Sequence, residues 1–150
     1  MFMKSIQSLC LIQSILMKTD LSNATFIIPI RIESDDRLRN VVTSIAFLVE
    51  NFDTNIIVKE VDKESVFQTE VLPIFEEILE VDLWKNFHHI FERSEEPLFH
   101  RQRVLNEMIA ECETDIVVNY DCDVILPMKS YELAYNGITE GIYDVVYPYG

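Results

Sequence analysis

Two aspartates separated by one residue, Asp121 and Asp123, directly follow the apolar, β-branched segment 115–120. Carboxylate oxygens are the ligands that Mg²⁺ and Mn²⁺ prefer, and these ions commonly take further oxygens from water and substrate phosphates. Alternate residues of an extended chain point to the same side, so both carboxylates are expected to converge on one ion. The triplet therefore predicts a divalent-cation site where a buried strand meets solvent, and the alternative is a polar strand end with two solvated acids.

Two other segments carry groups that suit a nucleotide. Phe99-x-Arg101-x-Arg103 opens a predicted helix, and Arg31 directly follows a predicted strand. Arginine pairs with phosphate oxygens and aromatic rings stack on bases. Taken alone, the first segment also fits an ordinary basic helix face, and the second fits a surface loop.

Buried strands and amphipathic helices alternate along the sequence. Hydrophobic runs predict strands at residues 25–30, 55–60, 87–91, 115–120 and 144–147. Helical spacing predicts helices over residues 34–52, 65–79, 99–112 and 131–136, the second with a break at Pro73. This alternation predicts an α/β fold in which helices cover both faces of a mostly parallel sheet.

Ligands of such sheets bind beyond the carboxyl ends of the strands. Several polar residues fall at or just after predicted strand ends: Arg31, Glu60, Asp62, Asp121 and Asp123. Their shared location is stronger support for a site than any one of them alone.

The order of these segments resembles the beta-1,4-galactosyltransferase family and its chondroitin-synthase-like relatives. The resemblance covers about residues 24–150 and is densest at 99–106 and 121–128. These relatives are inverting, metal-dependent glycosyltransferases of the GT-A fold, a Rossmann-like α/β architecture. The resemblance implies transfer of a hexose or N-acetylhexosamine from a UDP-sugar to a hydroxyl of a carbohydrate or glycoconjugate acceptor, with Mn²⁺ or Mg²⁺ as cofactor.

The resemblance also implies roles for individual residues. Asp123 would ligate the metal, and Asp121 would contact the ribose or sugar beside it. The other implied donor-binding positions are Pro29 and Arg31 bordering the diphosphate, Phe99 and Arg101 at the nucleotide, Cys122 within the triplet, and Glu60 and Asp62, which match loosely an acid near the base or ribose.

The chain departs from the family after Tyr147. Family members continue there with a segment rich in Gly, Trp and acids that supplies the catalytic base and acceptor contacts, and with a metal-binding histidine. Here the three histidines, His88, His89 and His100, precede Asp-x-Asp. The resemblance therefore assigns no catalytic residue within this sequence, and the base is expected beyond Gly150.

These observations predict how the chain is organised. Residues 23–150 are expected to form the donor-binding half of a GT-A domain, preceded by a helix or leader at 1–22. The acceptor site would then be supplied by a C-terminal half or a partner chain.

Composition narrows the function classes further. A formal net charge of -14 argues against nucleic acid as a partner, because an acidic surface repels phosphate backbones. The three cysteines form no disulfide or zinc pattern, and no apolar run reaches the ~18 residues of a membrane span, which favours the cytoplasm. With three glycines in the sequence, no Gly-rich phosphate loop is possible.

Four other functions remain open at this point. The chain could be a nucleotide-sugar-binding module without transferase activity. Asp121 and Asp123 also fit the nucleophile and acid of a haloacid-dehalogenase-type phosphatase, although its later lysine and acidic pair have little room in the remaining sequence. A nucleotidyltransferase is expected to have a Gly-rich loop after the first strand, and residues 31–36 contain no glycine. A structural domain without a ligand is the fourth.

Overall fold

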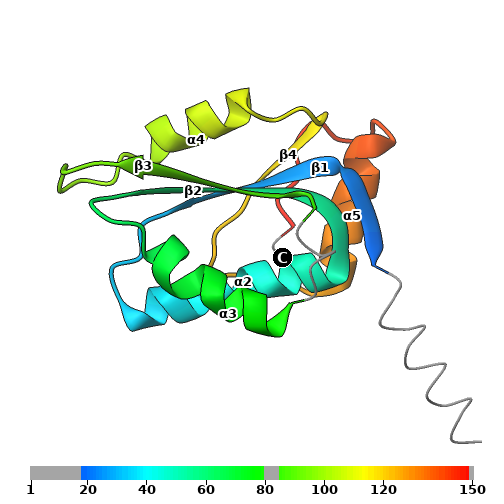
Figure 1. The fold of residues 1–150 in the computed structure, drawn as a ribbon. Coiled ribbons are helices and arrows are strands. Elements are labelled where there is room, and N and C mark those ends of the chain that lie inside the picture. The colour runs from blue at the N-terminus through cyan, green and yellow to red at the C-terminus, as the bar shows by residue number, and fades with distance from the viewer. Residues whose placement is uncertain (1–17, 80–84, 149–150) are drawn as a thin grey trace, which may run out of the picture.

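The sheet consists of four parallel strands. The computed structural model describes residues 18–79 and 85–148. Its strands are β1 (Thr19–Ile30), β2 (Phe52–Asp62), β3 (Phe87–Arg93) and β4 (Ile116–Asn119), in the spatial order β3-β2-β1-β4. All three strand pairings are parallel, which confirms the predicted sheet type (Figure 1).

Helices cover both faces of this sheet. Helix α2 (Asp35–Asn51), helix α3 (Leu72–Ile78) and helix α5 (Met128–Thr139) lie on one face, and α4 (Arg101–Ala110) lies on the other (Figure 1). A short π-helical segment, η1 (Phe67–Val71), leads into α3. The predicted α/β fold with helices on both faces is therefore confirmed. None of the described helices is long and apolar enough to cross a membrane.

Each face of the sheet has its own apolar core. Successive side chains of a strand point to opposite faces, so β1 divides its residues between the two cores. Phe26 and Ile28 pack into the larger cluster with α2, α3 and α5, whereas Ile27 packs into the smaller one with Val104 and Met108 of α4. The all-apolar run of β1 is explained by this burial on both sides.

Two helix boundaries follow the sequence signals closely. The Ser34 hydroxyl accepts a hydrogen bond from the Arg37 backbone N–H at 3.3 Å and caps α2. Pro73 lies in the first turn of α3, directly after η1, and its missing N–H interrupts the helical hydrogen-bond ladder there. The expected break at Pro73 thus takes the form of a change from π-helix to α-helix.

Two strand predictions differ from the structure. β1 begins at Thr19 rather than residue 25, because Leu21 is buried and Thr19 and Asp20 pair with β2 before a register shift. Residues 19–22 of the predicted helix or leader at 1–22 belong to β1, and its residues 1–17 lie outside the described ones. The predicted strand at 144–147 is wrong: that segment is not a strand, and Val145 and Tyr147 are 68% and 81% exposed.

Candidate functional site

The candidate site lies where the strand order reverses. From β1 the chain moves outward to β2 and β3, and β4 then pairs with the other side of β1. The carboxyl ends of β1 and β4 therefore form a topological switch point, the usual ligand position in open α/β sheets. Arg31 directly follows β1, and Asp121 comes two residues after β4.

Arg31, directly after β1, contacts the end of β2 and the loop that precedes α4. Its side chain is buried, with Nε donating to the Val61 carbonyl at 2.8 Å and Nη1 donating to the Pro97 carbonyl at 3.1 Å. Its guanidinium carbon lies 5.6 Å from the centre of the Phe99 ring, a cation–π contact. Pro29, two residues earlier, is half-buried within β1 opposite Lys59. Arg31 thus fixes the loop that leads into α4.

Arg101 connects the start of α4 to the end of β4. Its Nη2 forms an ion pair with Asp121 Oδ1 and lies 3.3 Å from Asn119 Oδ1. The two charged side chains are 44% and 54% exposed, so the pair is accessible to solvent. The structure thus brings together Arg101 and Asp121, which lie 20 residues apart in the sequence, and adds Asn119, which the sequence did not single out.

The Asp-x-Asp triplet forms a turn rather than an extended segment. The Val124 N–H donates to the Asp121 carbonyl at 3.3 Å, which closes a turn over 121–124. The expectation that an extended chain aligns both carboxylates is therefore wrong. Asp123 is exposed, and within the described part of the chain it makes no hydrogen bond or ion pair.

Cys122 faces inward from this turn. Its side chain packs against the larger core. Burial, aided by the charge of Asp123, raises the pKa of the Cys122 thiol, although the nearby Arg37 opposes the shift. A thiol with a raised pKa is a poor ligand for a hard cation. If a hard cation binds at the triplet, the two carboxylates are therefore its candidate ligands.

The donor chemistry of this turn suits Mg²⁺ or Mn²⁺. Asp121 and Asp123 offer hard oxygen ligands, and such ions are often held by one or two carboxylates together with waters and substrate phosphates. Within residues 18–79 and 85–148, no three His, Cys, Asp or Glu side chains cluster closely enough to hold a metal ion together. With two carboxylates, a cation at this turn would need further oxygen ligands from water or a bound phosphate.

The structure assigns no residue to the role of catalytic base. The base is expected beyond Gly150, and the described residues end at 148, so both Gly150 and that expected position lie outside them. The prediction of a base there stays a prediction.

The hydroxyl groups of two buried tyrosines form hydrogen bonds with the backbone at and just after the 121–124 turn. The Tyr120 hydroxyl donates to the Val124 carbonyl at 2.6 Å, and the Tyr131 hydroxyl accepts from the Leu126 N–H at 3.1 Å. The two hydroxyls are 3.2 Å apart, and both residues are 6% exposed. Sequence reasoning missed this pair, although Tyr120 ends the apolar run and Tyr131 begins the predicted last helix.

Tyr131→Phe is expected to lower the free energy of unfolding by about 1–2 kcal/mol, because it leaves the part-buried Leu126 N–H without its acceptor. The matched control is Tyr135→Phe on the same helix. Within the described segments, its hydroxyl accepts one long hydrogen bond, 3.4 Å, from the Asn23 backbone N–H. Urea denaturation measures both. Equal losses in the two variants would contradict the anchoring role of Tyr131.

Glu60 lies inside the protein and binds its own chain. The side chain is 0% exposed. Its carboxylate accepts hydrogen bonds from Ser65 Oγ at 2.5 Å and from the N–H groups of Val66 and Phe67 at 2.9 and 3.1 Å. His89 Nε2 lies 3.4 Å away. Glu60 therefore anchors the start of η1, and the expectation that it contacts a nucleotide is not supported by its position.

The pKa of Glu60 reflects this environment. Burial by itself raises the pKa, but His89, Ser65 and the Phe67 N–H together outweigh burial and bring it below the usual value. The carboxylate is therefore ionised at neutral pH. Asp62 has a different setting: it accepts from the Lys63 N–H at 2.7 Å and lines a pocket of about 350 Å³ at the ends of β2 and β3.

The two arginines at the start of α4 have separate partners. Arg103 forms ion pairs with Glu92 of β3 at 2.7 Å and Glu107 at 2.8 Å. Lys59 joins the same two acids at 3.1 and 2.5 Å. Burial lowers the pKa of Lys59, but its bonds to Glu107 and Glu92 more than compensate and raise it. This network, defined by Lys59, Glu92, Arg103 and Glu107, attaches α4 to the sheet.

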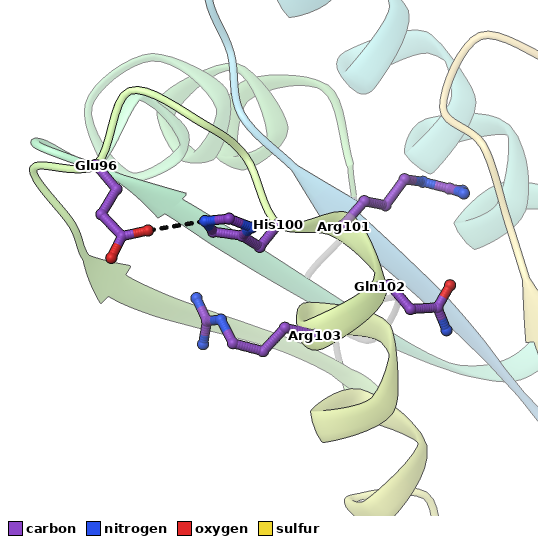
Figure 2. A pocket seen from close by; sticks show the side chains of 5 residues that line it. All are labelled: Glu96, His100, Arg101, Gln102 and Arg103. Atoms are coloured by element: carbon purple, nitrogen blue, oxygen red, sulfur yellow. Dashed lines mark ion pairs between the residues drawn. The ribbon is translucent and has the colours of Figure 1, made fainter.

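An open pocket of about 550 Å³ lies around the start of α4 (Figure 2). Its lining residues are Glu96, His100, Arg101, Gln102 and Arg103. Figure 2 shows Arg101 and Arg103 pointing to opposite sides of the helix, and His100 reaching Glu96 at 2.9 Å. Of the two arginines, only Arg101 therefore reaches the Asp-x-Asp turn.

The protein was also compared with known proteins. No protein-family model matches the chain, and no curated protein matches it.

Proposed function

We propose that this protein binds a UDP-sugar together with Mn²⁺ or Mg²⁺ at the carboxyl edge of β1 and β4. The observation that supports the proposal best is the contact between Arg101 and Asp121 at the switch point of the sheet. In this contact an arginine, a residue type that can pair with phosphate oxygens, lies beside a carboxylate of Asp-x-Asp. A metal-bridged diphosphate requires such an arrangement of one cation binder and one anion binder.

The proposed roles follow from the contacts. Asp121 and Asp123 hold the cation, and Arg101 binds the diphosphate. Arg31 is committed to Val61 and Pro97, so it positions the loop and the Phe99 ring. A bound divalent cation would supply neutralisation of the leaving diphosphate.

We propose inverting transfer of a hexose or N-acetylhexosamine to an acceptor hydroxyl as the reaction. The support for this finer statement is the resemblance of residues 99–106 and 121–128 to galactosyltransferases. The acceptor site and catalytic base would come from a C-terminal half beyond Gly150 or from a partner chain. A nucleotide-sugar-binding module without transferase activity is the second candidate, because the contact between Arg101 and Asp121 supports ligand binding and does not by itself support sugar transfer.

Thermal unfolding in four conditions tests the binding proposal: buffer, Mn²⁺, UDP, and both together. We expect a large stabilisation only with both ligands, about 2.7 kcal/mol at a hundred times the Kd of UDP. Uridine with Mn²⁺ serves as the control ligand, since it lacks the diphosphate. If the unfolding temperature shifts in none of the four conditions, a structural domain without a ligand is favoured. A separate assay with an aryl phosphate tests the phosphatase alternative, which release of phosphate would favour.

A further inference from the structure

The two groups assigned to opposite parts of the ligand neutralise each other in the structure. Arg101, proposed to bind the diphosphate, is paired with Asp121, proposed to hold the cation. Arg101 also contacts Asn119 at 3.3 Å, so its guanidinium lies directly over the end of β4. While this pair is closed, the positive charge of Arg101 disfavours a cation at Asp121, and the negative charge of Asp121 disfavours a diphosphate at Arg101.

We infer that the Arg101–Asp121 ion pair is a latch that makes cation binding and nucleotide binding depend on each other. The inference rests on the proposed function. Asp121 can accept a cation favourably only when Arg101 has moved away, because like charges at such short range repel. Arg101 can accept a diphosphate favourably only when it has left the Asp121 carboxylate, for the same reason.

Both ligands require the same ion pair to break. The first ligand to bind meets the free-energy cost of breaking it, and the second ligand binds without that cost. The result is positive coupling, and the coupling is reciprocal: Mn²⁺ raises the affinity for UDP by the factor by which UDP raises the affinity for Mn²⁺. An exposed ion pair contributes modestly, so the latch accounts for a coupling of up to about fivefold. Direct contact between the cation and the diphosphate would add to this factor.

The latch can open without disturbing the fold, because each side is anchored independently. On one side, α4 is attached to the sheet through Arg103, Lys59 and their two glutamates. On the other, the 121–124 turn is held by the Tyr120 and Tyr131 hydroxyls. Arg101 and Asp121 are both about half exposed, so their side chains have room to separate.

The nucleotide arm of the test measures UDP affinity by calorimetry in EDTA, without any divalent cation. Asp121→Asn releases Arg101, and we expect it to bind metal-free UDP about two- to fivefold more tightly than Asp123→Asn. The second variant is a matched control, since it removes the same charge two residues away from an aspartate that makes no ion pair among the described residues. Equal affinities in the two variants would overturn the latch.

The cation arm needs no nucleotide. Arg101→Gln frees Asp121, so we expect it to bind Mn²⁺ alone about two- to fivefold more tightly than Arg37→Gln, measured by the electron paramagnetic resonance signal of free Mn²⁺. Arg37 is the control because it is exposed and near enough for its charge to act on Cys122. Equal or weaker Mn²⁺ binding by Arg101→Gln would overturn the latch. Wild-type protein that binds no UDP even with Mn²⁺ would instead refute the proposed function itself.

Discussion

Glu60→Ala is expected to lower the free energy of unfolding by about 3–5 kcal/mol, one of the two largest effects we predict. The substitution leaves three hydrogen-bond donors at the start of η1 without their acceptor: Ser65 Oγ and the N–H groups of Val66 and Phe67. It also leaves His89 Nε2, which is buried, without the nearby carboxylate. Unsatisfied buried donors each cost about 1–3 kcal/mol.

The control for Glu60 is Asp62→Ala on the same strand. Asp62 is only half-buried, and among the described residues its carboxylate accepts one hydrogen bond, from the adjacent Lys63 N–H. We expect a loss below about 1 kcal/mol for this variant. Urea denaturation monitored by circular dichroism gives both values. Similar losses for the two variants would contradict the anchoring role of Glu60.

Glu60→Gln adds a pH test. The pKa of Glu60 is lowered in the folded protein, so the stability from its ionised form is fully present above the unfolded pKa, near the usual 4.5. That stability is lost as the pH falls through the folded pKa, below 4.5. The stability difference between wild type and Glu60→Gln is therefore expected to stay constant above about pH 5.5 and to shrink below about 4.5. A difference that grows on acidification would contradict this sign.

Asp123→Ala is expected to lower UDP affinity in the presence of Mn²⁺ at least about tenfold, the second large effect. Under the proposed function the variant retains one of the two carboxylates, and a charged interaction of this kind contributes about 1.5–3 kcal/mol. The fold should be unaffected, because Asp123 is exposed and makes no hydrogen bond or ion pair within the described segments. Stability in buffer is expected to change by less than about 0.5 kcal/mol.

Glu113→Ala is the matched control for Asp123. Glu113 is also an exposed acid beside β4, but it precedes the strand and so lies at the amino edge of the sheet. It should retain full UDP affinity with Mn²⁺, measured by the same calorimetric titration. Equal UDP affinities of Asp123→Ala and Glu113→Ala in the presence of Mn²⁺ would contradict a metal-binding site at the triplet.

The fold could be predicted largely from hydrophobic pattern. The continuous apolar run at 25–30 indicated a strand buried on both faces, and the structure buries both sides of β1 there. The apolar residues 56–58 marked the second strand. Local capping signals placed the start of α2 correctly at Ser34. The pattern failed at residues 144–147, because a short apolar run does not reveal whether a neighbouring strand is present to pair with it.

The site could be predicted only in part. Strand ends placed Arg31 and Asp121 at one edge, because parallel strands end together. Which charges pair across that edge depends on contacts between distant segments, and local pattern carries no such information. Arg101 pairs with Asp121 whereas Arg103 pairs with Glu92. The hydrogen bond between the Leu126 N–H and the Tyr131 hydroxyl likewise joins the turn region to a separate element, α5, so local sequence pattern does not predict it.

The most direct test of the nucleotide site is a nuclear magnetic resonance titration of the ¹⁵N-labelled protein with UDP and Mg²⁺, which is diamagnetic. We predict that the largest amide shift changes fall on Phe99 to Arg101 and on Asn119 to Asp123, with smaller changes at Arg31. The pocket at the ends of β2 and β3, lined by Asp62, Lys63 and Arg93, should change little. Changes confined to that second pocket, or no changes at saturating UDP and Mg²⁺, would contradict the proposed site.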